Sequence, residues 1–199
     1  MAVLTLVLIG LWLAVIVGLR AVVESGRGDR AEIRFRDPPG TVQWWAKVVS
    51  SIGFAAIVGA AVADLLGMPP ISMLDRIPVA VVGVGLVVIG IVLTVVAQFA
   101  MGDSWRADVD PEVRPALVTS GPFARVRNPV LTGVVLTLLG FVLMTPNLIA
   151  LAAWAIAVGG MQIQVRGVEE PYLRRTLGAT YTDYAARTGR FLPRLGRLH

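Results

Sequence analysis

The chain has 199 residues, of which 56% are hydrophobic and only 16% are charged, and its formal net charge is +5. Soluble domains typically carry about 25% charged residues, so these values argue against a soluble enzyme and against a disordered chain. The chain has no cysteine and its single histidine is His199, which excludes disulfides and cysteine-ligated metals and argues against histidine-based metal sites and Ser-His-Asp triads. We therefore predict an integral membrane protein without a metal site.

Five apolar segments follow one another, at residues 1–19, 48–63, 77–102, 130–144 and 148–165. Crossing the bilayer core takes roughly 20 helical residues, and a helix satisfies its own backbone polar groups in lipid. The first segment lacks the basic start and the cleavage site of a signal peptide, so we expect it to remain as a span. The last two are short, and the three residues between them predict an antiparallel hairpin that either spans or tilts. The predicted fold class is an all-α, polytopic membrane bundle with about five transmembrane helices.

The basic residues orient these segments. The stretches 20–47, 103–129 and 166–199 carry six, four and seven Lys or Arg residues, whereas 68–76 carries only Arg76 and 145–147 carries none. Cytoplasmic loops are enriched in Lys and Arg. We therefore expect an amino terminus outside, a cytoplasmic carboxyl terminus, and residence in a bacterial inner membrane, where the basic residues meet anionic membrane lipids. Nothing in this pattern requires nucleic acid as a partner.

The chain divides into two regions. Residues 1–101 form an amino-terminal transmembrane region that includes the basic loop 20–47. Residues 102–199 comprise a connector loop, the helical hairpin 130–165 and a tail helix at 166–187. In the tail, Leu173, Leu177, Tyr181 and Tyr184 follow one helical stripe. This pattern predicts a cytoplasmic amphipathic helix that either lies on the membrane or caps the bundle.

Polar residues gather at two places on the predicted cytoplasmic side. Asn128-Pro129 is a plausible helix start, with Asn capping and Pro at the first position. Such a helix end, with Arg125 and Arg127 beside it, suits a carboxylate or a phosphate, although an ordinary capped loop has the same pattern.

The second polar place is the adjacent pair Glu169 and Glu170. Arg166 lies three and four residues before them, so helix geometry can bring it to either one. A functional carboxylate there would bind a cation or ribose hydroxyls, whereas the alternative is a solvated acidic pair. Within the third span, Gly83, Gly85 and Gly90 predict close helix packing.

At these places the sequence resembles the isoprenylcysteine carboxyl methyltransferase family, which is related to the membrane phospholipid methyltransferases. The resemblance covers the second half of the chain. It rests on Leu117-Val118-Thr119-Ser120-Gly121-Pro122-Phe123, Arg127-Asn128-Pro129, Glu169-Glu170 and Gly178-x-x-Tyr181-x-x-Tyr184, in that order.

The resemblance implies S-adenosyl-L-methionine as methyl donor. It carries a catalytic role to Arg166 and Glu170. The chain departs from the family at Asn128, where His is usual, and at Leu131 and Phe123, where Tyr is usual. The implied donor-binding residues are Ala116, Leu117, Val118, Phe123, Asn128, Pro129, Val130, Leu131 and Glu169.

The resulting hypothesis is methyl transfer to a carboxylate or an amine of a lipidic, isoprenoid or prenylated acceptor at the cytoplasmic membrane face. Displacement at a sulfonium needs neither a metal nor a cysteine nucleophile, which agrees with the composition. Two alternatives stay open. One is an NADPH-dependent membrane reductase of the sterol-reductase type, and the other is a non-catalytic membrane subunit.

Overall fold

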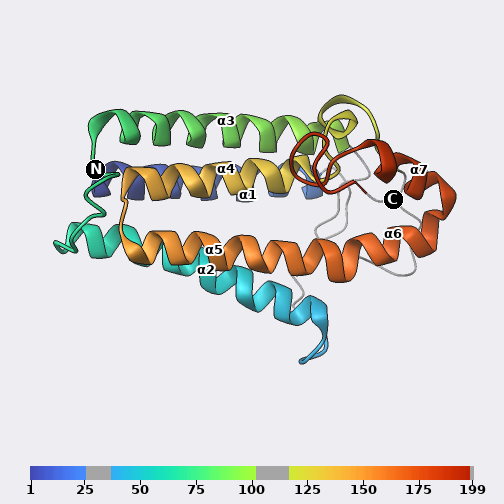
Figure 1. The fold of residues 1–199 in the computed structure, drawn as a ribbon, viewed down its shortest axis with the longest axis horizontal. Helices are drawn as coiled ribbons and strands as arrows, with labels where there is room; N and C mark the ends of the chain where they lie inside the picture. Colours follow the sequence, from blue (N-terminus) through green and yellow to red (C-terminus); the bar gives the residue numbers. More distant parts are fainter. Residues whose placement is uncertain (26–36, 102–116, 198–199) are drawn as a thin grey trace.

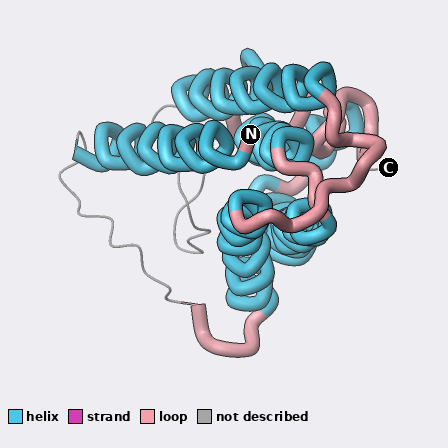
Figure 2. The backbone as a smooth tube through the Cα atoms, turned by 90° about the vertical axis from the view of Figure 1, so that its left-hand side faces the viewer, coloured by secondary structure: helices cyan, strands magenta, loops and turns pink. Residues whose placement is uncertain are grey.

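The computed structural model describes residues 1–25, 37–101 and 117–197. These residues form helices joined by loops, with no strand among them (Figure 2). In chain order, the elements are α1 (Ala2–Ser25), α2 (Val42–Leu65), α3 (Ile77–Met101), the 3₁₀ turn η2 (Gly121–Ala124), α4 (Pro129–Met144), α5 (Leu148–Gln164), the π-helical turn η3 (Val165–Glu169), α6 (Glu170–Leu177) and α7 (Ala179–Arg187) (Figure 1).

Three helical segments among the described residues are long and apolar enough to cross a membrane: Val42–Leu65, Ile77–Met101 and Leu148–Leu177. The apolar helices Ala2–Gly18 and Pro129–Met144 are shorter. The all-helical membrane architecture is therefore confirmed, whereas the count of five spans stays a prediction. Helix α2 begins six residues earlier than its apolar segment, so that Trp44 and Trp45 lie in its first turn.

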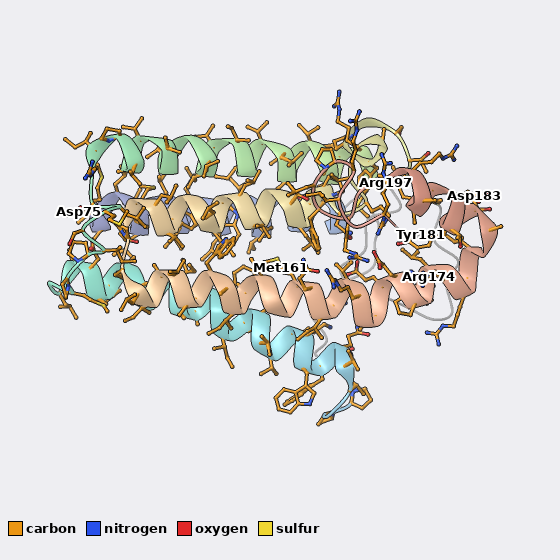
Figure 3. The ribbon with its side chains drawn as sticks, in the orientation of Figure 1. Asp75, Met161, Arg174, Tyr181, Asp183 and Arg197 are labelled. Atoms are coloured by element: carbon orange, nitrogen blue, oxygen red, sulfur yellow. The ribbon has the colours of Figure 1, made fainter. Side chains whose placement is uncertain are left out.

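The long helices α1 to α5 alternate in direction along the bundle (Figure 1). Helix α3 packs against α4 and α2 packs against α5, whereas α1 diverges from the other helices toward its carboxyl end (Figure 2). One end of the bundle carries the start of α1, the α2–α3 loop and the α4–α5 turn. The other end carries α6, α7 and the start of α4. Asp75 lies at the first end, and Arg174, Asp183 and Arg197 lie at the second (Figure 3). Where the structure describes them, the segments that the charge count assigns to opposite sides thus lie at opposite ends of the bundle.

Helices α3 and α4 pack closely along a line of glycines. A Cβ atom at Gly83 would lie 2.8 Å from the Gly140 carbonyl oxygen, and one at Gly133 would lie 2.6 Å from that of Gly90. Seven residues make about two helical turns, so both contacts fall on the same faces of the two helices. The packing predicted for Gly83 and Gly90 is confirmed, but it is wrong for Gly85, which faces open space.

Helices α2 and α5 form a second close pair. A Cβ atom at Gly53 would lie 2.6 Å from the Ala157 Cα, and one at Gly160 would lie 3.0 Å from the Ala46 carbonyl oxygen. The predicted α4–α5 hairpin is confirmed, and fully buried Asn147 stabilises it. The Asn147 side chain accepts a hydrogen bond from the Ala150 N–H at 2.9 Å and donates one to the Ala60 carbonyl of α2 at 3.0 Å.

The glycine line yields a first prediction. Replacing Gly90 by alanine forces a methyl group against Thr137, whose backbone nitrogen would lie 2.7 Å from the new Cβ. We expect Gly90→Ala to lower the free energy of unfolding by about 1–3 kcal/mol, the usual cost of overpacking. The matched control is Gly85→Ala in the same helix, because a Cβ there meets nothing within 4 Å. Melting curves in detergent check the difference, and equal effects would contradict the packing argument.

The charge asymmetry yields a second prediction, on orientation. The chain has no cysteine, so a single introduced thiol reports on its own position. We expect a membrane-impermeant maleimide to label Asp75→Cys in intact spheroplasts, and Asp183→Cys only after permeabilisation. Both positions are exposed, so the two variants control for each other. The reverse labelling pattern would overturn the predicted orientation.

Candidate active site

A cavity of about 350 Å³ lies between α2, α4, α5 and the turn η3. It lies toward the end of the bundle that carries α6, because its lining residues come from the first half of α2, the start of α4 and the end of α5. Its wall changes from polar near Lys47 to apolar near Phe54, which lies about 10 Å further along α2. The lining residues are Ala46, Lys47, Ser50, Ser51, Phe54, Leu131, Val134, Met161, Gln164 and Glu169.

The π-helical turn η3 brings two polar side chains of this wall together. In an α-helix, residues five apart point in different directions, whereas a π-helical turn aligns residues i and i+5. Gln164 and Glu169 have this spacing, and both line the cavity. Gln164 is a hydrogen-bonding neighbour of the Glu169 carboxylate. Its own carbonyl oxygen Oε1 is buried and has no hydrogen-bond partner among the described residues.

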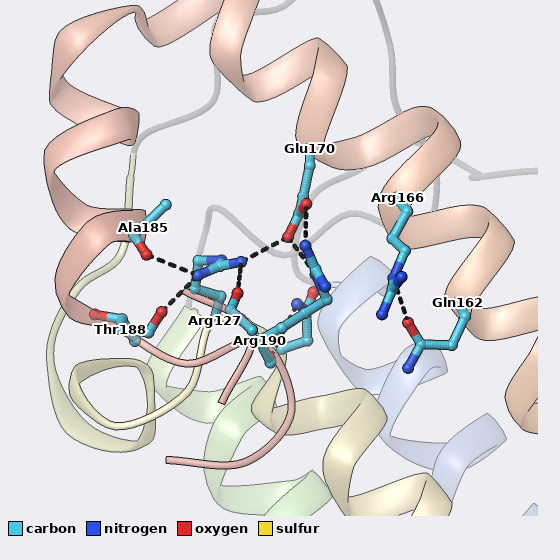
Figure 4. A network of polar contacts seen from close by, with 9 residues as sticks. Arg127, Gln162, Arg166, Glu170, Ala185, Thr188 and Arg190 are labelled. Carbon is cyan, nitrogen blue, oxygen red and sulfur yellow. Dashed lines mark hydrogen bonds and ion pairs between the residues drawn. The ribbon is translucent and has the colours of Figure 1, made fainter. Parts of the chain in front are cut away.

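Glu170, the next residue, is held by two arginines (Figure 4). Arg127 Nη2 donates to Glu170 Oε1 at 2.8 Å, and Arg190 donates from Nε to Oε1 at 2.7 Å and from Nη2 to Oε2 at 2.9 Å. The side chains of Arg127 and Glu170 are only 2% and 6% exposed. The Glu170 hydrogen bonds raise the pKa of Arg190 above its ordinary value. Glu170 therefore forms a buried ion triad with Arg127 and Arg190.

Residues 188–197, which we call the C-terminal strap, lie across the start of α4. The Gly189 carbonyl accepts from the Arg127 N–H at 2.8 Å, and the Arg190 carbonyl accepts from the Asn128 N–H at 3.1 Å. The Phe191 carbonyl accepts from the Thr132 hydroxyl at 2.9 Å. Arg127 Nη2 also donates to the Gly196 carbonyl at 2.9 Å. The strap thus covers the helix end that was predicted to face an anion.

This arrangement corrects the predicted role of Asn128 as a helix cap. Its side chain makes no capping hydrogen bond, although Pro129 does occupy the first helical position as predicted. The Asn128 amide instead donates to the Arg190 carbonyl at 3.2 Å, which turns the side chain toward the strap.

The tail is helical but is not the single helix predicted for residues 166–187. It divides at Gly178, whose φ of +55° suits glycine, into α6 and α7. Tyr181 and Tyr184 are nevertheless buried in one apolar cluster, whose partly buried members are Leu117, Leu173 and Leu177. The Tyr184 hydroxyl donates to the Phe123 carbonyl at 2.6 Å. Burial raises the pKa of Tyr184 to about 12. The stripe therefore packs against the connector at Leu117 and Phe123, whereas its role as a cytoplasmic amphipathic helix stays a prediction.

Two of the predicted donor-binding residues, Leu131 and Glu169, line the cavity. Ala116 lies outside the described residues. The others occupy the connector and the start of α4 next to the strap, and they are not among the residues that line the cavity: Leu117, Val118, Phe123, Asn128, Pro129 and Val130.

Arg166 lies on the exposed side of η3, where its Nε donates to Gln162 Oε1 at 2.9 Å (Figure 4). Arg166 was expected to reach one of the two glutamates, but it bonds to Gln162 instead. The π-helical turn changes the angular spacing between Arg166 and the glutamates, and Glu170 pairs with Arg127 and Arg190. Sequence reasoning did not assign a role to Gln164, Lys47 or Ser50. Gln164 is a polar residue at the end of an apolar segment, and this position could have marked it as a candidate site residue. No pattern in the neighbouring sequence predicts the π-helical turn that places it beside Glu169.

The ion triad yields a prediction for the stability of the fold. Removing one partner of a buried ion pair leaves an uncompensated charge, which typically costs about 3–5 kcal/mol. We expect Glu170→Ala to lower the free energy of unfolding by an amount in that range. Arg187→Ala is the control, since Arg187 is exposed and its hydrogen bond among the described residues goes to the Asp183 carbonyl four residues earlier. Thermal melting of the purified variants measures both effects, and a loss for Glu170→Ala no larger than the control's would contradict the triad's structural role.

Comparison with known proteins shows the family. A family model described as phospholipid methyltransferase matches residues 79–180, which include most of α3 and all of α4, α5, the turn η3 and α6. No curated protein matches the chain. The matched stretch covers just over half of the sequence and contains Leu131, Gln164, Glu169 and Glu170. The chain therefore belongs to the phospholipid methyltransferase family of membrane methyltransferases.

Proposed function

We propose that this protein transfers a methyl group from S-adenosyl-L-methionine to a carboxylate or an amine of a lipidic or isoprenoid acceptor at the cytoplasmic face of the membrane. The observation that carries the proposal is the cavity between α2, α4 and α5. Within it, Leu131 and Glu169, which lie 38 positions apart and are both donor-binding residues implied by the family resemblance, line the wall together with Gln164.

The residues of this wall suit the donor. S-adenosyl-L-methionine, when bound, supplies an electrophilic methyl group on a positively charged sulfonium. The unpartnered Gln164 Oε1 and the Glu169 carboxylate are hydrogen-bond acceptors, which match ribose hydroxyls and an ammonium group. A carboxylate also favours a nearby positive charge. Leu131, Val134 and Met161 offer apolar contacts on the same side.

The opposite wall belongs to α2, which lies outside the matched stretch 79–180. Lys47, Ser50 and Ser51 are polar groups near the level of Trp44 and Trp45, residue types that favour the membrane interface. Phe54 continues this wall deeper into the bundle. The change from polar to apolar along one helix supports an amphiphilic acceptor with its headgroup near Lys47. Asp37 holds Lys47 through an ion pair of 2.7 Å.

The chain contributes orientation and shielding to the reaction in this proposal. Holding two reactants in line replaces an encounter in solution, and the displacement of water when both reactants bind leaves an attacking carboxylate or amine less solvated. Arg166, exposed at the cytoplasmic end of α5, is proposed to meet the acceptor. The remaining motif residues, from Leu117 to Val130, are proposed to border the donor from the connector side.

Glu170 takes a supporting role in the proposal, because both of its carboxylate oxygens accept hydrogen bonds from arginines. Its participation in the reaction itself stays a prediction.

Calorimetric titration with S-adenosyl-L-methionine, or with its demethylated product, tests the donor site. We expect Glu169→Gln to weaken binding about tenfold, which corresponds to the loss of one charge-assisted hydrogen bond of about 1.4 kcal/mol. Asp183→Asn makes the same chemical change at an exposed position and should bind like the unaltered protein. No binding by the unaltered protein, or equal binding by both variants, would count against the proposal.

Activity is tested by incubating the purified protein with radiolabelled donor and a lipid extract of its host. A labelled lipid that disappears with Glu169→Gln supports the proposal, and its alkaline lability separates a methyl ester from a methylated amine. Binding of NADPH in place of the methyl donor would instead favour the reductase alternative.

A further inference from the structure

We propose that Arg190, on the C-terminal strap, is a positioning residue that holds Glu169 at the cavity by fixing its neighbour Glu170. Arg190 lies beyond the matched stretch 79–180, so the family comparison assigns it no role. The inference rests on the proposed function, in which Glu169 contacts the donor.

The first step is the fork that Arg190 makes with Glu170. Its Nε and Nη2 atoms donate to the two different carboxylate oxygens, at 2.7 Å and 2.9 Å. Two parallel hydrogen bonds from a planar guanidinium fix the plane of a carboxylate, which a single bond does not. Arg127 reaches only Oε1 and does so with one nitrogen. Arg190 therefore determines the orientation of Glu170.

The second step leads from Glu170 to Glu169. Glu169 ends the π-helical turn and Glu170 begins α6, so whatever fixes Glu170 fixes the end of that turn. π-Helical turns are rare and are commonly found at functional sites, because the α-helix is the more stable geometry. Adjacent helical residues diverge by about 100°, which lets Glu170 face the strap while Glu169 faces the cavity.

The third step is that hydrogen bonds fix the backbone of Arg190. Its backbone N–H donates to the Leu195 carbonyl at 2.7 Å, and its carbonyl accepts from the Asn128 N–H at 3.1 Å. Gly189 before it has no room for a side chain, since a Cβ there would lie 2.8 Å from the Arg194 nitrogen. The strap thus presents the Arg190 guanidinium from a backbone anchored on α4.

Arg190 can be removed without dismantling the buried part of the triad. Arg127 keeps its ion pair with Glu170 and its bonds to the carbonyls of Ala185, Thr188 and Gly196. The Arg190 side chain is also more exposed than that of Arg127, at 13% against 2%. We therefore expect Arg190→Ala to fold and to lose mainly the orientation of Glu170.

The test compares Arg190→Ala with Arg190→Lys and with Arg197→Ala, an exposed arginine on the same strap. We expect Arg190→Ala to raise the Kd and KM for the donor about tenfold, the scale of one charge-assisted hydrogen bond, with a smaller change in kcat. Arg190→Lys should recover part of the loss, because an ammonium restores the charge but not the fork. Arg197→Ala should bind like the unaltered protein.

A double-mutant cycle shows whether Arg190 acts through Glu170. If it does, Arg190→Ala should change donor binding less than about twofold in a Glu170→Gln background, because coupled residues are not additive. Full additivity would overturn the proposal, as would equal losses in Arg190→Ala and Arg197→Ala.

A spin label at Glu169→Cys, in this cysteine-free chain, provides a readout that needs no donor. We expect the label to be immobilised when Arg190 is present and to become mobile in Arg190→Ala and, less so, in Arg190→Lys. Mobility that does not change in either variant would overturn the positioning role. Loosening of the label, together with an absence of donor binding by the unaltered protein, would instead mean that the positioning holds and the proposed function fails.

Discussion

The structure of this protein's carboxyl-terminal half depends on one buried carboxylate. Glu170 lies between Arg127 and Arg190, which come from segments 43 residues before it and 20 residues after it. A buried charge is costly unless it is paired and hydrogen-bonded, so these three segments are stable only together. The connector, the α5–α6 junction and the strap therefore form one unit at a single end of the bundle. The cavity borders this unit, and its Glu169 is the neighbour of the central carboxylate.

The cavity also depends on where the helices pack most closely. Glycine lets α3 approach α4, and small residues let α2 approach α5, to the point where an added methyl group would collide with the opposite backbone. In an apolar solvent, such close packing is a main source of helix association. Between α2 and α4 the facing residues are larger, among them Phe54, Leu131 and Val134, and the space left between them is the cavity. The two closely packed helix pairs thus leave a wider gap between α2 and α4, and the polar residues that line this gap lie at one end of it.

Much of this arrangement could be predicted from the sequence, because it is local. Apolar segments of the right length predicted α1 to α5, with errors of up to six residues at their ends, and the arginine distribution grouped by end those parts of the loops that the structure describes. The motif indicated the family, and the resemblance named Leu131 and Glu169 as donor-binding residues. The remaining features depend on distant parts of the chain. No local pattern announces that Asn128 will bond to the strap instead of capping α4, or that Glu170 will be enclosed by two arginines. Glu169 and Glu170 are neighbours in the sequence, and their different roles become clear only in the fold. Glu169 lines the cavity, and Glu170 forms the ion triad.

The π-helical turn has a consequence for how this region can change in length. Val165–Glu169 contains one residue more than an α-helical turn would use for the same advance along the helix axis. Losing that residue would rotate α6 by about 100° relative to α5 and would bring a different side chain opposite the Arg190 guanidinium. A lost or gained residue in the loop between α2 and α3 would leave the cavity lining intact. At the α5–α6 junction, a lost residue would turn Glu170 toward the cavity, and a gained residue would turn Glu169 toward the strap. The number of residues in the turn η3 therefore determines which glutamate side chain lines the cavity.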